Sequence, residues 1–286
     1  MAFLIGEYFK IFEDLVMDKL KAEIIKKWYN IIQLSPKYND EFEDALSEVE
    51  LPDKIRIETY NFDEKCGKKN LLSFLYMCED LEKSYREKGI SGDILCDTLQ
   101  DIKIWLDIWS DIKGELYLGE IGWLKNHLSM KLFKLGRLQF CMGKAEINIP
   151  EKNITKGDNV IEVHIPAVGP LKEQECLKSF AKAKAFFKKF YPDFKYKYFT
   201  CHSWLLDSTL KEILTSESNI IKFQNMYEIV DKEKSDAILK YVFKWNTTRD
   251  NLHKFEPTSD FAKKVKEYTV LRKNFYEVLG VIDKNI

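Results

Sequence analysis

The stretch VIEVHIPAVGPLKEQECLKSFAKAKAFFKKFYPDFKYKYFTCHSWLLD, residues 160–207, decides the fold of this chain. It begins with an alternating run rich in β-branched side chains, which predicts a strand with His164 near its end. Pro166 ends that strand, because proline has no N–H to give to a ladder hydrogen bond. A second alternating run, residues 195–203, predicts another strand with His202 near its end. The residues between the two runs predict a turn and a helix.

The connection between these strands has the signals of a sharp turn followed by an amphipathic helix. Gly169 can adopt backbone conformations closed to other residues, and Pro170 suits the first position of a helix. The helix predicted over residues 171–190 has acidic residues in its first turns and lysines in its last, which complements a helix dipole. Its free amino-terminal N–H groups are a candidate anion site beside the strand end. An ordinary connection without a ligand is the alternative.

Two of the four histidines, His164 and His202, are candidates for catalysis. They become neighbours if the two strands pair side by side across the helix, as a right-handed βαβ unit allows. An imidazole can accept a proton near neutral pH, so either ring could act as the general base for an amine nucleophile. The alternative is that the rings hydrogen-bond to backbone at the strand ends. His127 and His253 are assigned no role.

Other polar residues near the second strand have simpler interpretations. Cys201 precedes a histidine, but adjacent strand residues point to opposite faces, so a core thiol is expected rather than a thiol–imidazole pair. Asp207 could orient a histidine, although a helix cap is favoured. Arg137 could meet a phosphate, although a surface or interdomain ion pair is commoner.

Four segments together resemble the signature of a known family: LGRLQF (135–140), HIPAVGPL (164–171), CHSWLLD (201–207) and SNIIKFQ (218–224). They are similar to those of a bacterial family of acyltransferases with an all-helical amino-terminal domain followed by a GNAT-like domain, an N-acetyltransferase fold. The resemblance extends from about Gly119 to about Phe223, and the amino-terminal half matches in general pattern only. It implies an α+β chain, with a helical domain over residues 1–118 and a GNAT-like mixed α/β domain over residues 119–286.

The resemblance also implies an activity. In GNAT enzymes the turn after the central strand holds the pyrophosphate of acyl-CoA through backbone N–H groups, and two splayed strands admit the pantetheine arm. Carried onto this chain, the cofactor-binding positions are Pro166, Val168, Gly169 and Leu171, and the candidate bases are His164 and His202. The implied reaction is direct transfer of an acyl group from acyl-CoA or acetyl-CoA to an unidentified small-molecule amine.

The turn departs from the usual GNAT pattern. That pattern is Gln or Arg, two residues, Gly, one residue, then Gly or Ala. Here Gly169 stands alone and is followed by Pro170, which has no N–H to give. A non-catalytic GNAT-like binding or interaction protein is therefore the alternative function, and a hydrolase that uses Cys201 or Ser203 is a weaker third.

Composition excludes several classes of protein. The chain has 45 basic and 46 acidic residues, so no overall attraction to nucleic acid or an anionic membrane is expected. The six cysteines are spread singly without a CxxC pair, so neither a metal site nor a disulfide framework is predicted. Neither a signal peptide nor an apolar run long enough to span a bilayer is apparent, so a cytoplasmic protein is expected. A homodimer is compatible with the wide aromatic stripes of the predicted helices.

The rest of the chain gives predictions of elements. Predicted helices cover residues 3–34, 39–49, 69–88, 91–109, 123–135, 236–245 and a last segment after Ser259. Further strands are predicted over residues 137–142, 146–150 as its hairpin partner, 219–229 and 278–282. The glycines of residues 112–122 mark the expected hinge between the domains.

Overall fold

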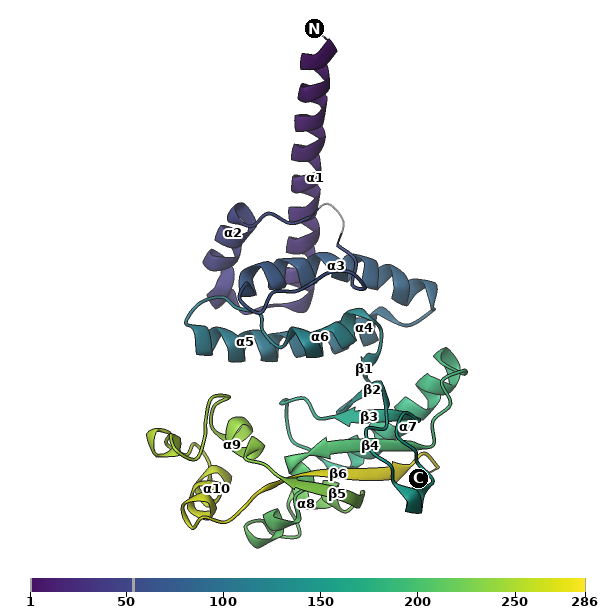
Figure 1. Cartoon of the computed structure of the whole chain (residues 1–286), viewed down its shortest axis with the longest axis vertical. Coiled ribbons are helices and arrows are strands. Elements are labelled where there is room, and N and C mark those ends of the chain that lie inside the picture. Colours follow the sequence, from purple (N-terminus) through teal and green to yellow (C-terminus); the bar gives the residue numbers. More distant parts are fainter. Residues whose placement is uncertain (1, 53–54, 286) are drawn as a thin grey trace. The chain divides into compact units, whose positions relative to one another are not determined.

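The chain divides into two compact units, Met1–Lys131 and Leu132–Ile286 (Figure 1). The structure, a computed structural model, describes residues 2–52 and 55–285. The predicted domain boundary at Gly119 lies within the first unit, shortly before its last helix. Among the described helices, none combines the length and the apolar character needed to cross a bilayer.

The described part of the first unit is helical, as its apolar periodicity predicts. Its helices are α1 Ala2–Ile32, α2 Asn39–Glu48, α3 Gly67–Glu87, α4 Gly92–Leu99, α5 Asp101–Lys113 and α6 Ile121–Leu128. The single helix predicted over residues 91–109 is wrong, because α4 ends before Gln100 and α5 begins after it. The helix predicted over residues 123–135 is too long, because the chain turns at Met130, where φ is 52°.

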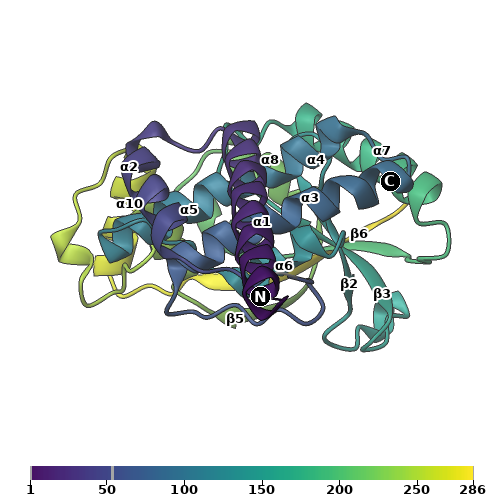
Figure 2. The same ribbon diagram turned by 90° about the horizontal axis from the view of Figure 1, so that it is seen from above.

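The core of the first unit forms where α1 packs against α3 (Figures 1 and 2). Trp28 of α1 is 1% exposed, and its Nε1–H donates to Glu79 of α3 at 3.0 Å. Between α5 and α6, Asp101 accepts the indole N–H of Trp123 at 2.8 Å and lies 3.2 Å from Nε2 of the buried His127. His127 is therefore part of the packing between these helices.

The described residues of the second unit form a six-stranded sheet in the order β1-β2-β3-β4-β6-β5. Its strands are β1 Leu132–Lys134, β2 Gln139–Lys144, β3 Asn159–His164, β4 Tyr198–Ser203, β5 Glu228–Lys234 and β6 Tyr276–Asp283. Its helices are α7 Glu173–Phe190, α8 Asn219–Gln224, α9 Ala237–Val242 and α10 Asp260–Val270. β3 and β4 are parallel, and every other neighbouring pair in this sheet is antiparallel. The fold class expected from the resemblance, a helical region followed by a mixed α/β domain, is confirmed.

Two local predictions in this unit are wrong, and a third is shifted at one end. Residues 146–150 do not pair with β2, which lies between β1 and β3. Residues 219–229 are not one strand, because Ser218 accepts the N–H of Ile220 and caps α8, and β5 follows it. The long helix of the central stretch is confirmed to end at Phe190, although it begins at Glu173 rather than about Leu171.

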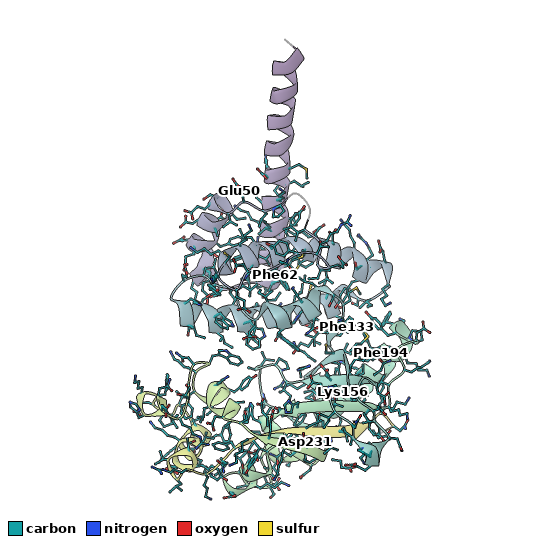
Figure 3. All side chains as sticks on the ribbon, viewed as in Figure 1. Glu50, Phe62, Phe133, Lys156, Phe194 and Asp231 are labelled. Carbon is teal, nitrogen blue, oxygen red and sulfur yellow. The ribbon has the colours of Figure 1, made fainter. Side chains whose placement is uncertain are left out.

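One face of the sheet packs against α7 through aromatic side chains. Phe180 of α7 lies edge-on to Phe140 of β2 and Phe199 of β4, with ring centroids 5.6 and 5.1 Å apart. Phe133 of β1, labelled in Figure 3, packs against Phe186 at 4.6 Å. Since strand side chains alternate, the histidines of β3 and β4 lie on the opposite face.

Candidate active site

The ladder between β3 and β4 opens toward the carboxyl ends of the two strands. Each strand has six residues, yet they pair only at Ile161 with Phe199 and at Glu162 with Thr200. Beyond these pairs β3 stays bonded to β2 as far as His164, and β4 stays bonded to β6 as far as Ser203. Two neighbouring strands in the middle of the sheet therefore separate while their outer sides remain paired.

The turn after β3 is tied to the corner between β1 and β2 by Arg137. Its guanidinium donates to three backbone carbonyls, those of Pro166 at 3.2 Å, Gly169 at 3.1 Å and Pro170 at 3.1 Å. Burial lowers the pKa of Arg137, which nevertheless stays charged near neutral pH. The predicted ion pair is wrong, because these three contacts are to neutral carbonyls. A positive charge therefore lies directly behind the turn.

The N–H groups of the turn are used unequally. The N–H of Val168 donates to the carbonyl of Pro166 at 2.7 Å, and Pro170 has none to offer. Gly169 has a φ of 60°, a left-handed conformation that suits glycine. Among the described residues, no acceptor meets the N–H of Ala167, Gly169 or Leu171. These three groups remain as donors for an anion, beside the charge of Arg137.

His164 lies at the end of β3 with a carboxylate beside it. Its Nε2 is 3.5 Å from Oε2 of Glu162, and both side chains are about one-third exposed. The carboxylate of Glu162 lies across β2 over Gly143, where a Cβ would overlap it. A carboxylate in this place can orient an imidazole and stabilise the imidazolium that forms when the ring takes a proton. Alternation alone places Glu162 on the face of His164, so this partner was readable from the sequence.

His202 lies on the same face of the neighbouring strand, next to a different carboxylate. Its Nε2 is 3.8 Å from Oε1 of Glu233 on β5, and the His202 side chain is 48% exposed. His164 and His202 each lie two residues beyond the last pair between β3 and β4. Each histidine thus lies near the end of its strand, as predicted, and both strand ends are at the opened end of the ladder. Glu233 was missed, because the strand that carries it was predicted wrongly.

The alternative nucleophiles are occupied elsewhere. Cys201 is 1% exposed on the face covered by α7, and burial raises the pKa of its thiol to about 12. The hydroxyl of Ser203 accepts the N–H of Leu205 at 3.2 Å. A core thiol at Cys201 is confirmed, and neither residue is placed as a nucleophile.

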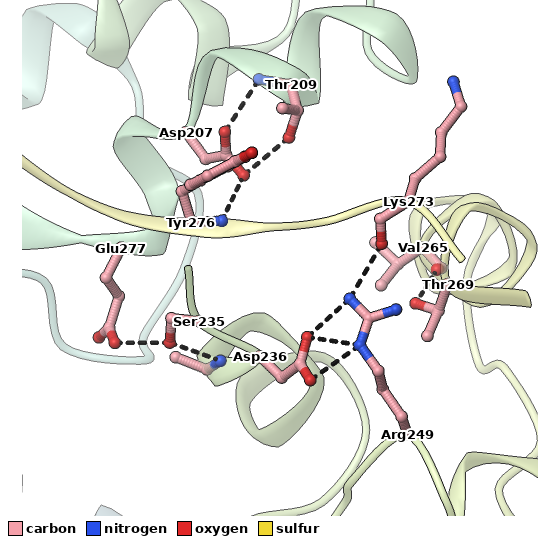
Figure 4. Close-up of polar contacts among 11 residues, drawn as sticks. Asp207, Thr209, Ser235, Asp236, Arg249, Val265, Thr269, Lys273, Tyr276 and Glu277 are labelled. Carbon is pink, nitrogen blue, oxygen red and sulfur yellow. Dashed lines mark hydrogen bonds and ion pairs between the residues drawn. The ribbon is translucent and has the colours of Figure 1, made fainter. Parts of the chain in front are cut away.

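Asp207 is a buried cap rather than a partner of a histidine. Its carboxylate accepts the N–H and the hydroxyl of Thr209 at 3.0 and 2.7 Å, and the N–H of Tyr276 at 2.9 Å (Figure 4). The residue is 2% exposed. The favoured interpretation of Asp207 as a cap is confirmed. It also ties the segment after β4 to the first residue of β6.

A sheet whose central parallel strands separate beside a strand–turn–helix corner defines the second unit as a GNAT-like domain. Residues 132–282 match the family model of the GNAT-like C-terminal domain, and residues 10–130 match that of the N-acyltransferase N-terminal domain. The chain belongs to the family of proteins that combine these two domains.

Solved structures with the same fold are acyltransferases. One, in complex with decanoyl-CoA and teicoplanin, is 19% identical, with a TM-score of 0.76 over 91% of this chain and 88% of that chain. Another, in complex with decanoyl-CoA, is 23% identical, with a TM-score of 0.68 over 88% of this chain and 74% of that chain. No match was found among curated proteins. At this level of identity the likeness establishes the fold.

Proposed function

We propose that this protein transfers an acyl group from acyl-CoA directly to the amine of a small molecule. The observation that carries this proposal is the opening between β3 and β4 beside a turn that offers three backbone N–H groups. Membership of the family supports it. So do the structural neighbours, whose complexes contain decanoyl-CoA, octanoyl-CoA, CoA and, in two cases, teicoplanin or 10C-teicoplanin.

The residues of the turn fit a cosubstrate that carries a diphosphate. The N–H groups of Ala167, Gly169 and Leu171 point to an anion site, since each lacks an acceptor among the described residues. Arg137 adds a positive charge behind the turn. Acyl-CoA would supply a thioester whose carbonyl carbon accepts the nucleophile. The opened strands offer its arm a route to the histidines.

The histidines have the surroundings of a general base. The imidazole of His164 or His202 takes the proton that the amine loses as its nitrogen bonds to the acyl carbon. The carbon–sulfur bond breaks in the same transfer, and the coenzyme leaves as a thiolate, which becomes a thiol by taking the proton held on the imidazolium. Glu162 lies 3.5 Å from His164 and Glu233 lies 3.8 Å from His202, so each ring has a carboxylate to balance its positive charge.

Titration of the full chain with octanoyl-CoA in a calorimeter tests the cosubstrate. Saturable heat is expected, together with release of free thiol when an amine is added. His164→Gln and His202→Gln keep the size of the side chain and remove the base. The variant that loses thiol release but keeps affinity for octanoyl-CoA identifies the base. Absence of saturable heat at millimolar octanoyl-CoA would contradict the proposal.

A non-catalytic binding protein is the second candidate, and the turn itself favours it. Pro166 and Pro170 have no N–H, and the N–H of Val168 is already bonded within the turn. Fewer donors than a glycine-rich turn provides would weaken binding of a diphosphate. This candidate predicts that octanoyl-CoA neither binds nor releases thiol in a chain that remains folded.

A further inference from the structure

A second site lies in the same unit, away from the turn. A pocket of about 380 Å³ is lined by the two residues between β5 and α9, by α9 and the segment after it, and by the start of β6. The lining residues that matter for binding are Ser235, Lys240, Tyr241, Trp245 and Glu277. The pocket therefore combines two aromatic rings with a carboxylate and an ammonium group.

Glu277 presents an oriented carboxylate to this pocket. Its Oε2 accepts the hydroxyl of Ser235 at 2.7 Å, and that hydroxyl in turn accepts the N–H of Ala237 at 3.1 Å (Figure 4). No described residue donates to its Oε1 or pairs with it as a cation. A half-buried carboxylate held by one oxygen leaves the other free for a hydrogen-bond donor.

The charges around the pocket favour a cation. Asp236 is neutralised by Arg249, whose Nε lies 2.9 and 2.8 Å from its two oxygens. Glu233 of β5 pairs directly opposite Glu277 of β6, so two like charges face each other across the ladder. Lys240 is the one cation in the described lining. A positively charged ligand beside Glu277 would relieve the repulsion between the two carboxylates.

The aromatic rings suit the same kind of ligand. Tyr241 is 52% exposed, and its ring lies edge-on to that of Trp245 at 5.2 Å. The ammonium of Lys240 lies 5.7 Å from the ring of Trp245, so this ring already meets one cation, whose place the ligand would take. An aromatic amine could stack on one ring and place its ammonium toward Glu277.

The pocket lies at the end of the sheet where β3 and β4 separate. Ser203, the last residue of β4, pairs with Val278, the residue after Glu277. His202 pairs with Leu279, so by alternation Glu277 and His202 lie on the same face of the sheet. Figure 1 shows α9 at the end toward which the arrows of β3 and β4 point. A ligand in the pocket would therefore lie on the side of the opened ladder where His202 stands.

We infer that this pocket binds the acyl acceptor, and that the acceptor is a cationic aromatic amine. Its ammonium meets Glu277, and its ring packs against Tyr241 and Trp245. This inference rests on the proposed function, because it names the acceptor of that reaction. His202 is the nearer of the two candidate bases along the sheet, being one strand from β6. The bound ammonium loses one proton to solvent before it attacks, and His202 takes the second proton, which the nitrogen loses as it bonds to the acyl carbon.

Matched indole ligands test the charge that the pocket selects. Tryptamine is the cationic probe, and indole-3-propionate is its anionic counterpart. Titrated into the full chain without acyl-CoA, tryptamine is expected to bind saturably and indole-3-propionate to bind at least tenfold more weakly. Equal binding of the two, tighter binding of the anion, or no binding of tryptamine would overturn the inference.

Two variants with opposite expected effects on tryptamine affinity locate the site. Glu277→Gln keeps the shape of the side chain and is expected to weaken tryptamine binding about tenfold. Lys240→Met removes the competing cation and is expected to strengthen it about threefold. Glu228→Gln, at the far end of β5, is the matched control and should leave the affinity unchanged. Equal effects of Glu277→Gln and Glu228→Gln in folded variants would contradict the assignment.

Separate titration with octanoyl-CoA keeps the two proposals distinguishable. Glu277→Gln should leave the affinity for octanoyl-CoA unchanged, because the pocket lies apart from the turn. If tryptamine binds but octanoyl-CoA does not, the pocket stands as a cation site and its role as acceptor site fails together with the proposed function. If octanoyl-CoA binds but tryptamine does not, the inference alone fails.

Discussion

Arg137 fixes the shape of the turn after β3 from behind. Arg137→Lys keeps the positive charge but cannot reach three carbonyls in the directions that a planar guanidinium reaches. We expect it to lower the free energy of unfolding by about 1–2 kcal/mol, since charged hydrogen bonds at a half-buried site are lost. We also expect weaker binding of octanoyl-CoA. Chemical denaturation and calorimetry measure the two effects.

The control for this variant is Arg272→Lys, at an exposed position of the same unit. It should change neither quantity. If Arg137→Lys leaves both the stability and the affinity as they are, the turn does not depend on the guanidinium.

Asp207 is the buried carboxylate on which several donors converge. Both carboxylate oxygens of Asp207 accept hydrogen bonds, from the N–H and hydroxyl of Thr209 and from the N–H of Tyr276. Asp207→Asn replaces one of these oxygens by an NH2 group, which cannot accept. We expect a loss of about 2–3 kcal/mol in the free energy of unfolding, because a buried donor is left without an acceptor. Urea denaturation measures it. A loss no larger than that of the exposed-loop control Asp250→Asn would contradict this interpretation.

Cys66 gives a prediction with a direction in pH. Its exposed thiol lies 3.4 Å from Oδ2 of Asp63, and this hydrogen bond raises the pKa of Cys66. A raised pKa means less thiolate near neutral pH, so Asp63→Asn should lower the pKa and speed alkylation by iodoacetamide. The pH at which the rate is half-maximal should fall. Cys201, whose pKa burial raises, should remain unmodified in the folded chain, and a rate unchanged by Asp63→Asn would show that the carboxylate is not responsible.

At the scale of elements, the pairing of β2 with β3 controls the position of Glu162. Gly143→Ala places a methyl group where the carboxylate of Glu162 lies and should displace it from His164. If His164 is the base, we expect a lower kcat for thiol release with unchanged affinity for octanoyl-CoA. Gly122→Ala, which adds its methyl group in open space, is the control. Full activity of a folded Gly143→Ala variant would exclude a role for the contact between Glu162 and His164.

Local sequence pattern correctly predicted the elements whose periodicity lies within the element itself. The alternation of residues 160–165 and of residues 195–203 predicted β3 and β4 and the face of each strand that carries its histidine, because alternation is a property of a single strand. The division of residues 219–229 into α8 and β5 was missed, because a mixed apolar run fits either element until a cap such as Ser218 is recognised. The hairpin at residues 146–150 was predicted wrongly for a different reason. β2 pairs instead with β1, whose residues were predicted as the end of a helix, and with β3.

The geometry of the candidate site also depended on distant residues. The capture of three carbonyls by Arg137 joins residues far apart in sequence, and no local signal distinguishes it from an ion pair. The acidic pair Glu233 and Glu277 follows from the register of β5 with β6, which includes a bulge. Both features required the register of the sheet.

At the scale of the whole molecule, two compact units with separate cores predict separable unfolding. Phe74→Ala opens a cavity in the first unit and Phe180→Ala in the second, each at a fully buried ring. Each should lower the free energy of unfolding of its own unit by about 3–5 kcal/mol. Hydrogen exchange followed by mass spectrometry reads both units in one experiment. Equal loss of protection in both units from either substitution would show that they unfold as one.

A sheet whose central strands separate has two unpaired strand edges in its interior as well as the two at its outer sides. Along the carboxyl-terminal halves of β3 and β4, backbone groups face each other across a space where no ladder forms. The outer edge strand β5 carries many charged side chains, which disfavour pairing with a strand of another molecule. Charged side chains inside the opening would instead obstruct a substrate. A guest that enters there is favoured if it is thin, extended and equipped with amides of its own. Water and bulky chains would each interact less favourably with those backbone groups.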